Sequence, residues 1–164
     1  MRTERSSGRA YADLLDPEGA DTARRNDLVR RAWGEWLDEH EWDRFITLTF
    51  PTSPSEASAR RRFEGWIARV AARAGHDIRW FRMTEHVPYH QRHVHALLSG
   101  SGELADELLQ RLWGKGRCKF EVYDRTLGGA YYITKAVGRS SADYDVDSVP
   151  WTRRADGPCN RTAA

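Results

Sequence analysis

Two histidines separated by one residue are the strongest candidates for chemistry in this chain. His93 and His95 flank Val94 in the segment 92–98, whose composition is typical of a β-strand. Side chains two positions apart on a strand point to the same face, so the two imidazoles would lie side by side with Val94 on the opposite face. Two adjacent imidazoles form a natural pair of ligands for a divalent metal ion.

A carboxylate can complete this ligand set. If residues 78–86 and 92–98 form a hairpin centred on residue 89, Glu85 lies opposite His93 on the same face. Two imidazoles and one carboxylate leave coordination positions open for a substrate oxygen. His86 and His90 are the alternatives to Glu85 as the third ligand. This donor set suits Mg²⁺ or Mn²⁺, and the imidazole pair favours Mn²⁺.

The segment Tyr132-Ile133-Thr134-Lys135 combines a nucleophile with a cation. Residues at i and i+3 share a helix face, so the phenol of Tyr132 and the ammonium of Lys135 can meet at one site. A phenol has a reference pKa of about 10, so it needs help to attack at neutral pH. Tyr131 is also on the same face as Lys135, at i and i+4, and the spacing alone leaves both tyrosines open.

The elements that must position these side chains follow from hydrophobic periodicity and from turn residues. The pattern predicts helices at about 21–39, 54–74, 104–113 and 130–137, and strands at 45–50, 78–86, 92–98 and 119–123. Ser53 is the expected N-cap of the second helix, with Pro54 at its first position, Glu56 closing a capping box and Gly75 at its end. After the leading helix the order is β-α-β-β-α-β-α. This order predicts a ferredoxin-like α+β sandwich, an antiparallel sheet with helices packed on one face.

Composition limits the class of protein. The chain has 164 residues, a net charge of +2 and no apolar run near the roughly 20 residues that a membrane span needs. We therefore expect one domain at 21–139, with a flexible arm at 1–20 and a polar tail at 140–164, in a cytoplasmic protein with no membrane partner. The two cysteines, Cys118 and Cys159, are far apart in unrelated contexts, which argues against a cysteine zinc site.

Taken in order, three motifs resemble those of the Rep class of HUH endonucleases, the rolling-circle replication initiators. The segment FITLTF at 45–50 resembles the first motif of that family. His93-Val94-His95 followed by Ala96-Leu97-Leu98 resembles its metal-binding motif, and Tyr132-Ile133-Thr134-Lys135 resembles its nucleophile motif. The resemblance covers about residues 42–138 and also fits the predicted order of strands and helices.

The resemblance implies a nuclease that acts on single-stranded DNA or on a DNA hairpin at a replication origin. A divalent ion on His93, His95 and Glu85 would hold the scissile phosphate, and Tyr132 would take the 5′ phosphate covalently while releasing a 3′-OH. Lys135 would offset the developing charge. We expect phosphate contacts from basic residues on the strands and on the segment before the last strand, namely Arg79, Arg82, Arg92, Lys115, Arg117 and Lys119.

Two features bear on partners. The sequence contains no GxxxxGK[ST] phosphate loop, so DNA unwinding would come from a host helicase or from another part of a longer chain. It has a single nucleophile motif, so a second cleavage would need water or a second copy of the chain in a homodimer.

Three other functions remain alternatives. A single-tyrosine HUH transposase would typically have a glutamine where Lys135 stands, and a non-catalytic hairpin binder would have lost one of the motifs. A zinc-stabilised structural domain would need a closed set of four ligands.

Overall fold

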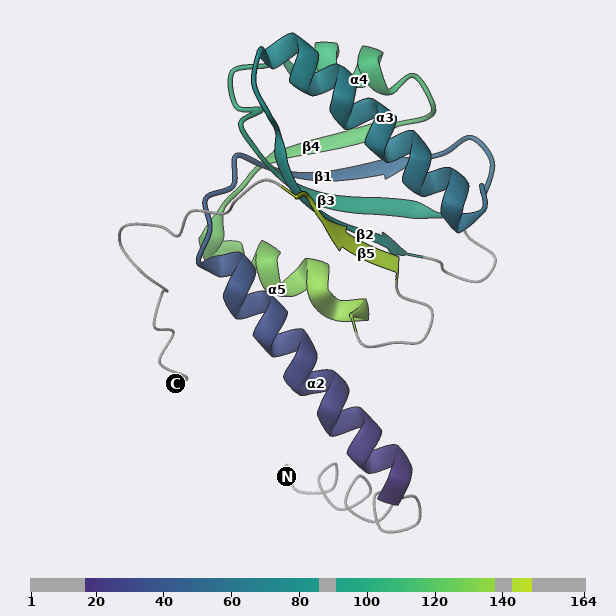
Figure 1. The fold of residues 1–164 in the computed structure, drawn as a ribbon, viewed down its shortest axis with the longest axis vertical. Coiled ribbons are helices and arrows are strands. Elements are labelled where there is room, and N and C mark those ends of the chain that lie inside the picture. The colour runs from purple at the N-terminus through teal and green to yellow at the C-terminus, as the bar shows by residue number, and fades with distance from the viewer. Residues whose placement is uncertain (1–16, 86–90, 138–142, 149–164) are drawn as a thin grey trace, which may run out of the picture.

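The protein is built on one five-stranded antiparallel sheet (Figure 1). The computed structural model describes residues 17–85, 91–137 and 143–148. The strand order is β4-β1-β3-β2-β5, and the strands are Arg44–Thr49 (β1), Arg79–Glu85 (β2), His93–Ser99 (β3), Cys118–Val122 (β4) and Asp143–Val146 (β5). The first four strands with their two connecting helices have the β-α-β-β-α-β order of a ferredoxin-like unit. The predicted α+β class is therefore confirmed.

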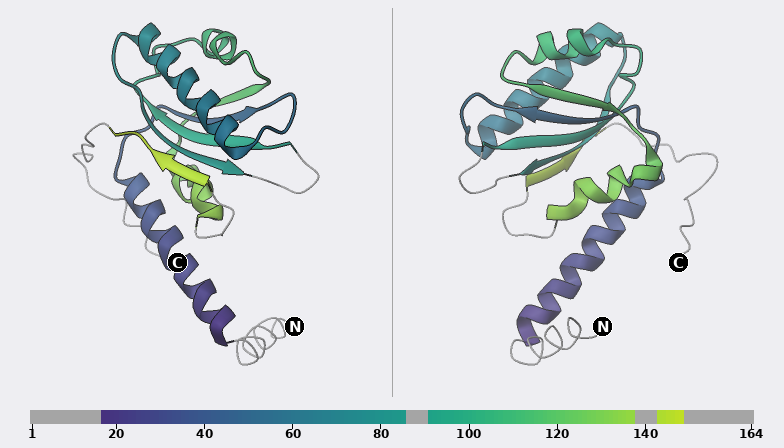
Figure 2. Two further views of the ribbon diagram at one scale, coloured as in Figure 1. Left: turned by 45° about the vertical axis from the view of Figure 1, so that its right-hand side comes forward. Right: turned by 180° about the vertical axis from the view of Figure 1, so that it is seen from behind.

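Helices cover both faces of the sheet, so the expectation that they share one face is wrong. Figures 1 and 2 show α3 (Glu56–Ala74) and α4 (Asp106–Trp113) on one face, and α2 (Pro17–Asp38) with α5 (Gly129–Ile133) on the other. Two short 3₁₀ turns, η1 (Arg125–Leu127) and η2 (Thr134–Ala136), flank α5. The physical reason lies in the strands, which carry buried apolar side chains on both faces and so require cover on both.

The two faces have separate apolar cores. The core beneath α3 and α4 contains Ile46, Leu48 and Val94 from the strands, packed with Trp66 and Trp113 from the helices. The core beneath α2 and α5 contains the following buried residues: Leu37, Trp42, Phe81, Met83, Leu97, Ala130, Ile133 and Val137. Each fully buried aromatic or aliphatic side chain contributes about 1.5–3 kcal/mol through removal from water.

Helix α3 begins at Glu56, and its N-cap is Ser55 rather than the predicted Ser53. The Ser55 side chain accepts a hydrogen bond from the amide of Ser58, and Ser55 has an extended backbone with φ −63° and ψ 158°. Pro54 therefore precedes the helix instead of opening it. The predicted stop is confirmed, since Gly75 adopts the left-handed conformation at φ 77° and its amide bonds back to Ala71.

Part of the predicted polar tail is a strand. β5 pairs antiparallel with β2 at the sheet edge, with Val146 opposite Phe81 and Asp143 opposite Thr84. Charge explains why so polar a sequence pairs there: the Arg82 guanidinium donates to both carboxylate oxygens of Asp143, at 2.7 and 3.1 Å. The expectation of a loosely ordered tail is thus wrong for residues 143–148, while 1–16 and 149–164 lie outside the described residues.

Helix α2 starts at Pro17, four positions before its predicted start, and only its C-terminal part packs on the sheet. Trp33 and Trp36 are partly buried against the second core, whereas Leu28 near the other end is 66% exposed. The N-terminal half of the helix projects away from the rest of the molecule (Figure 2). None of the described helices is both long and apolar enough to cross a membrane.

Candidate active site

The two histidines of the HxH motif share one face of the sheet, toward α5. They lie on β3, and the register places Glu85 of β2 directly opposite His93, as the hairpin geometry predicts. On the other side of β3, Thr47 of β1 lies opposite His95. The intervening Val94 is fully buried on the opposite face, in the core beneath α3 and α4. Three central strands thus bring these polar side chains to one end of one face.

His95 is held between two neighbouring strands. Its Nε2 lies 3.2 Å from Glu85 Oε2, and its Nδ1 lies 3.0 Å from Thr47 Oγ1. Burial lowers the pKa of His95, which keeps its imidazole neutral at neutral pH. Burial by itself would raise the pKa of Glu85, but hydrogen bonds from Lys135 and His95 outweigh it and lower that pKa. A neutral imidazole beside an ionised carboxylate is the state that ligates a metal.

The nucleophile motif lies on α5 and η2, above this end of the sheet. Helix α5 has only five residues, so its position depends on its neighbours. On one side Arg125 of η1 donates to both carboxylate oxygens of the buried Asp38 at the end of α2, at 3.0 and 2.9 Å. On the other side Ile133 and Val137 are buried in the second core.

Lys135 joins the tyrosine to the sheet. Its Nζ lies 3.2 Å from Tyr132 Oη and 3.1 Å from Glu85 Oε1. Burial disfavours the ammonium, but hydrogen bonds to Tyr132 and Glu85 outweigh that effect and raise the pKa of Lys135. A continuous hydrogen-bonded chain therefore runs from Tyr132 through Lys135, Glu85 and His95 to Thr47.

The structure distinguishes the two tyrosines that spacing left open. Tyr132 is 50% exposed, and its ring centroid lies 6.1 Å from that of His95. Tyr131 points the other way, onto α2, where its ring lies so close to Gly34 that an added Cβ would come within 2.5 Å of it. Tyr132 is the tyrosine that belongs to the polar cluster.

The fit of a metal to these donors is partial. Glu85 Oε2 and His95 Nε2, at 3.2 Å, are spaced as two ligands of one ion would be. The ring centroids of His93 and His95 are 6.4 Å apart, and no three His, Cys, Asp or Glu side chains among the described residues are gathered as a ready metal site. The alternative ligands His86 and His90 lie outside the described residues.

Two of the six predicted phosphate contacts lie away from this cluster. Arg82 is fully buried and bound to Asp143, so the prediction that it contacts a phosphate is wrong for the folded chain. Its alternation along β2 sets it on the opposite face from Glu85. Arg79 shares the face of Glu85 but begins the strand that Glu85 ends, about 20 Å away along six residues.

The other four predicted contacts lie at the end of the sheet that carries the motif. Arg92 directly precedes His93, and Lys115 and Arg117 are in the segment that leads into β4. The backbone of Arg117 bonds to Thr49, which is the register partner of His93. Lys119, on β4 itself, is 70% exposed and lies 3.0 Å from Glu121.

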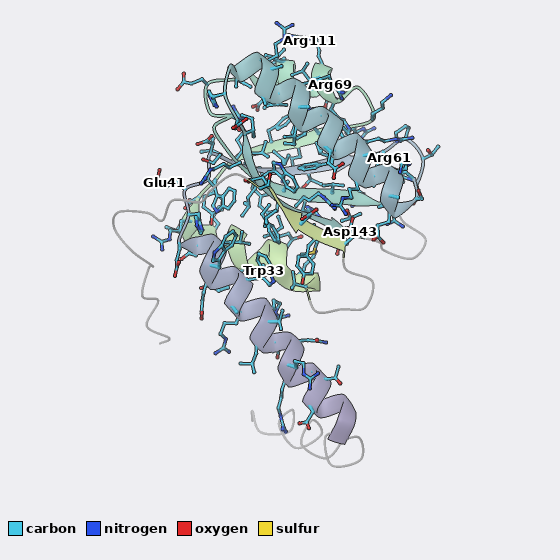
Figure 3. The ribbon with its side chains drawn as sticks, in the orientation of Figure 1. Trp33, Glu41, Arg61, Arg69, Arg111 and Asp143 are labelled. Carbon is cyan, nitrogen blue, oxygen red and sulfur yellow. The ribbon has the colours of Figure 1, made fainter. Side chains whose placement is uncertain are left out.

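Cations also gather on the opposite side of the molecule. Arg61 and Arg69 on α3 and Arg111 on α4 extend outward from those helices, beyond the face that α5 does not cover (Figure 3). Asp143 is seen at the sheet edge, beside β5. These arginines are therefore remote from Tyr132.

A cleft of about 310 Å³ opens beside Tyr132 and His95, between the β1–β4 side of the sheet and the start of α5. Its walls include Phe45 and Thr47 of β1, and Lys119 of β4. The tyrosine and the histidine motif thus face a space that can receive a substrate.

Comparison with protein families agrees with this geometry. The family model of the replication-associated protein ORF2 matches residues 43–139, which is more than half of the chain. The chain belongs to this family. It is a family of rolling-circle replication initiators, in agreement with the resemblance to Rep-type HUH endonucleases. Searches of curated proteins and of solved structures give no match.

In this replication-associated protein, sequence reasoning missed one residue of the cluster. Thr47 received no role, although it lies in FITLTF and its hydroxyl contacts His95 Nδ1. The available signal was alternation, because Thr47 and Thr49 are polar residues on one face of a strand whose other face is fully buried. What alternation does not give is the register against β3.

Proposed function

We propose that this replication-associated protein is a metal-dependent tyrosine endonuclease that nicks single-stranded DNA at an origin and can rejoin it. The observation that carries the proposal is the hydrogen-bonded chain from Tyr132 through Lys135 to Glu85 and His95. It joins an exposed phenol to a histidine–carboxylate pair, within a family of replication initiators.

The reaction exchanges one phosphodiester for another. Tyr132 Oη attacks phosphorus, the bond from phosphorus to the 3′ oxygen breaks, and the 5′ phosphate becomes joined to the tyrosine. The phenol loses a proton and the departing 3′ oxygen gains one, so atoms and charge balance without a further reactant. Because the phosphotyrosine bond is a phosphodiester, a free 3′-OH can reverse the step and rejoin the strand.

Individual side chains have distinct roles in this proposal. Lys135, whose Nζ lies 3.2 Å from Tyr132 Oη, stabilises negative charge on that oxygen during attack. Glu85 and His95 would hold Mn²⁺ or Mg²⁺, with His93 joining them by turning its ring. The ion would supply charge stabilisation at the phosphate. Thr47 fixes the imidazole of His95 through Nδ1, which leaves Nε2 available as a ligand.

The substrate and partners are part of the same proposal. A single strand or the loop of a hairpin leaves the scissile phosphate accessible to an exposed tyrosine. Lys119, Arg92, Lys115 and Arg117 would contact neighbouring phosphates at this end of the sheet. A host helicase would supply unwinding, and a second copy of the chain could supply a second tyrosine.

A covalent-adduct assay tests the proposal. The protein is incubated with Mn²⁺ and a randomised single-stranded DNA pool and then run on a denaturing gel, with Tyr132→Phe beside the neighbouring Tyr131→Phe as the matched control. We expect an adduct in the wild type and in Tyr131→Phe, none in Tyr132→Phe, and none with EDTA. An adduct that is lost only in Tyr131→Phe, or that persists in EDTA, would contradict it. Tight DNA binding without any adduct would instead favour a non-catalytic binder.

A further inference from the structure

The cleft beside the active site has a wall that the proposed reaction does not use. Tyr132 and His95 form its inner end, and the remaining wall comes from β4, η1 and the start of α5. Val122 and Leu127 lie in this outer wall and are 83% and 81% exposed, the two most exposed of the large apolar side chains that the structure describes. Exposed apolar groups so close to a polar active site need a reason.

The cleft also contains aromatic rings suited to stacking. Phe45 lies 5.9 Å from Tyr132 between ring centroids, at 62°, and Tyr123 lines the same space. An added Cβ on Gly129 would come within 3.0 Å of the Tyr123 ring, so the glycine gives the ring its room. Aromatic and apolar walls bind the flat face of a nucleobase whatever its identity.

Two carboxylates in the same wall exclude a phosphate. The register opposite Phe45 sets Glu121 on the face of the cleft, and Asp124 follows β4. Asp124 is held by Thr126, whose amide and hydroxyl donate to Oδ1 at 2.8 and 2.6 Å. Those hydrogen bonds lower the pKa of Asp124, so it is ionised at neutral pH. Anionic oxygens repel the DNA backbone but accept hydrogen bonds from the amino group of a base.

We propose that this cleft is a subsite for one unstacked nucleobase next to the scissile phosphate, and that Glu121 and Asp124 make it prefer a base with an exocyclic amino group over thymine. The proposal rests on the proposed nuclease function, because Tyr132 and His95 line the same space. The base stacks within the cleft and its edge donates to the carboxylates. Its phosphate is left at the Tyr132 end, so the subsite sets both the position of cleavage and part of its sequence preference.

A binding measurement without chemistry tests the base preference. Wild-type protein in EDTA is titrated with fluorescent dC and dT ten-mers, two pyrimidine strands of equal charge, at one salt concentration. We expect dC to bind about fivefold more tightly than dT, the size of one charged hydrogen bond. In the double variant Glu121→Gln/Asp124→Asn the preference should fall below about twofold, since amides both donate and accept. Glu107→Gln on α4, an exposed carboxylate on the other face, should keep it.

The same cleft can be tested through its apolar wall. Val122→Ser with Leu127→Ser should weaken binding of both strands about threefold, while Leu28→Ser, at an exposed leucine on α2, should change neither. Equal binding of dC and dT by the wild type, or a preference that survives in the double carboxylate variant, would overturn the subsite.

Sequencing of trapped adducts then separates this inference from the nuclease proposal. Adducts on Tyr132 with thymine depleted at one position beside the joined phosphate would support both. Adducts with no such depletion would keep the nuclease and overturn the subsite. A dC preference that depends on Glu121 and Asp124, without any adduct, would keep the subsite and overturn the nuclease.

Discussion

The two faces of the sheet are made by the same strands but are closed in different ways. Beneath α3 and α4 the indoles of Trp66 and Trp113 are buried, and each donates to a backbone carbonyl, Leu109 O at 3.1 Å and Thr49 O at 3.0 Å. Beneath α5 the cover is incomplete, and the polar chain from Tyr132 to Thr47 reaches the cleft. The 19-residue α3 has a side-chain N-cap, whereas the five-residue α5 has none. One face stabilises the fold, and the other leaves its reactive groups accessible.

This comparison predicts that stability and activity can be lost separately. The largest effect is expected from Trp66→Ala, which removes a fully buried indole from the α3 face and should lower the free energy of unfolding by about 3–5 kcal/mol. Chemical denaturation measures that loss. Adduct formation per folded molecule should remain at the wild-type level at low temperature. A loss of activity in fully folded Trp66→Ala would show that the two faces are coupled.

On the other face, Lys135→Met should do the opposite. Removing the ammonium that contacts Tyr132 and Glu85 should slow adduct formation about 100-fold, in the range seen when one charge-stabilising donor is lost. The midpoint of denaturation should move little, because the side chain is partly exposed. Single-turnover kinetics at saturating Mn²⁺ provide the test, with Lys119→Met as the matched lysine control. Equal slowing in both variants would remove the special role of Lys135.

The ion pair at the β5 edge predicts a pH-dependent contribution to stability. Burial would raise the pKa of Asp143, but the hydrogen bond and charge of Arg82 outweigh it and lower that pKa. A carboxyl with a depressed folded pKa stabilises the fold above its unfolded pKa, and this stabilisation is lost as the pH falls through the folded value. Asp143→Asn should therefore cost about 2 kcal/mol at pH 7 and progressively less below about pH 4.

Urea denaturation of the wild type and Asp143→Asn between about pH 3 and pH 8 checks this dependence. Asp21→Asn, which removes an exposed ion pair on α2, is the control and should cost little at any pH. A difference between the wild type and Asp143→Asn that does not change with pH would contradict the assigned ion pair.

The smallest effect is expected from Thr47→Val. Loss of the hydroxyl that contacts His95 Nδ1 should weaken Mn²⁺ binding about tenfold, the usual size of such an outer contact. Thr49→Val is the matched control on the same strand and face, because the Thr49 hydroxyl bonds to the backbone of Arg117 instead. Isothermal titration with Mn²⁺ measures both, and equal losses would count against a specific contact to His95.

The sequence was sufficient for the interactions that are local or set by a short hairpin. The pairing of Glu85 with His93 followed from a turn centred on residue 89, and the end of α3 followed from Gly75. The start of α3 was misplaced because Ser53 and Ser55 are both good caps, and only the backbone of the folded chain selects one. These features depend on neighbours within a few residues.

Long-range pairings were beyond local rules. Arg82 looks like any strand cation in the sequence, and its partner Asp143 comes 61 residues later in a segment that is too polar to predict as a strand. The choice between Tyr131 and Tyr132 depends on Gly34, which lets the Tyr131 ring lie against α2. In both cases the deciding contact joins elements that are far apart in the chain.

The most direct test of the central claim is to locate the DNA on the protein. After reaction with Mn²⁺ and nuclease trimming, trypsin should release the peptide 126–135, which contains both tyrosines, and fragmentation by mass spectrometry assigns the modified one. The account predicts a nucleotide joined through its 5′ phosphate to Tyr132. A nucleotide on Tyr131, or an unmodified peptide under conditions in which DNA is cut, would contradict it.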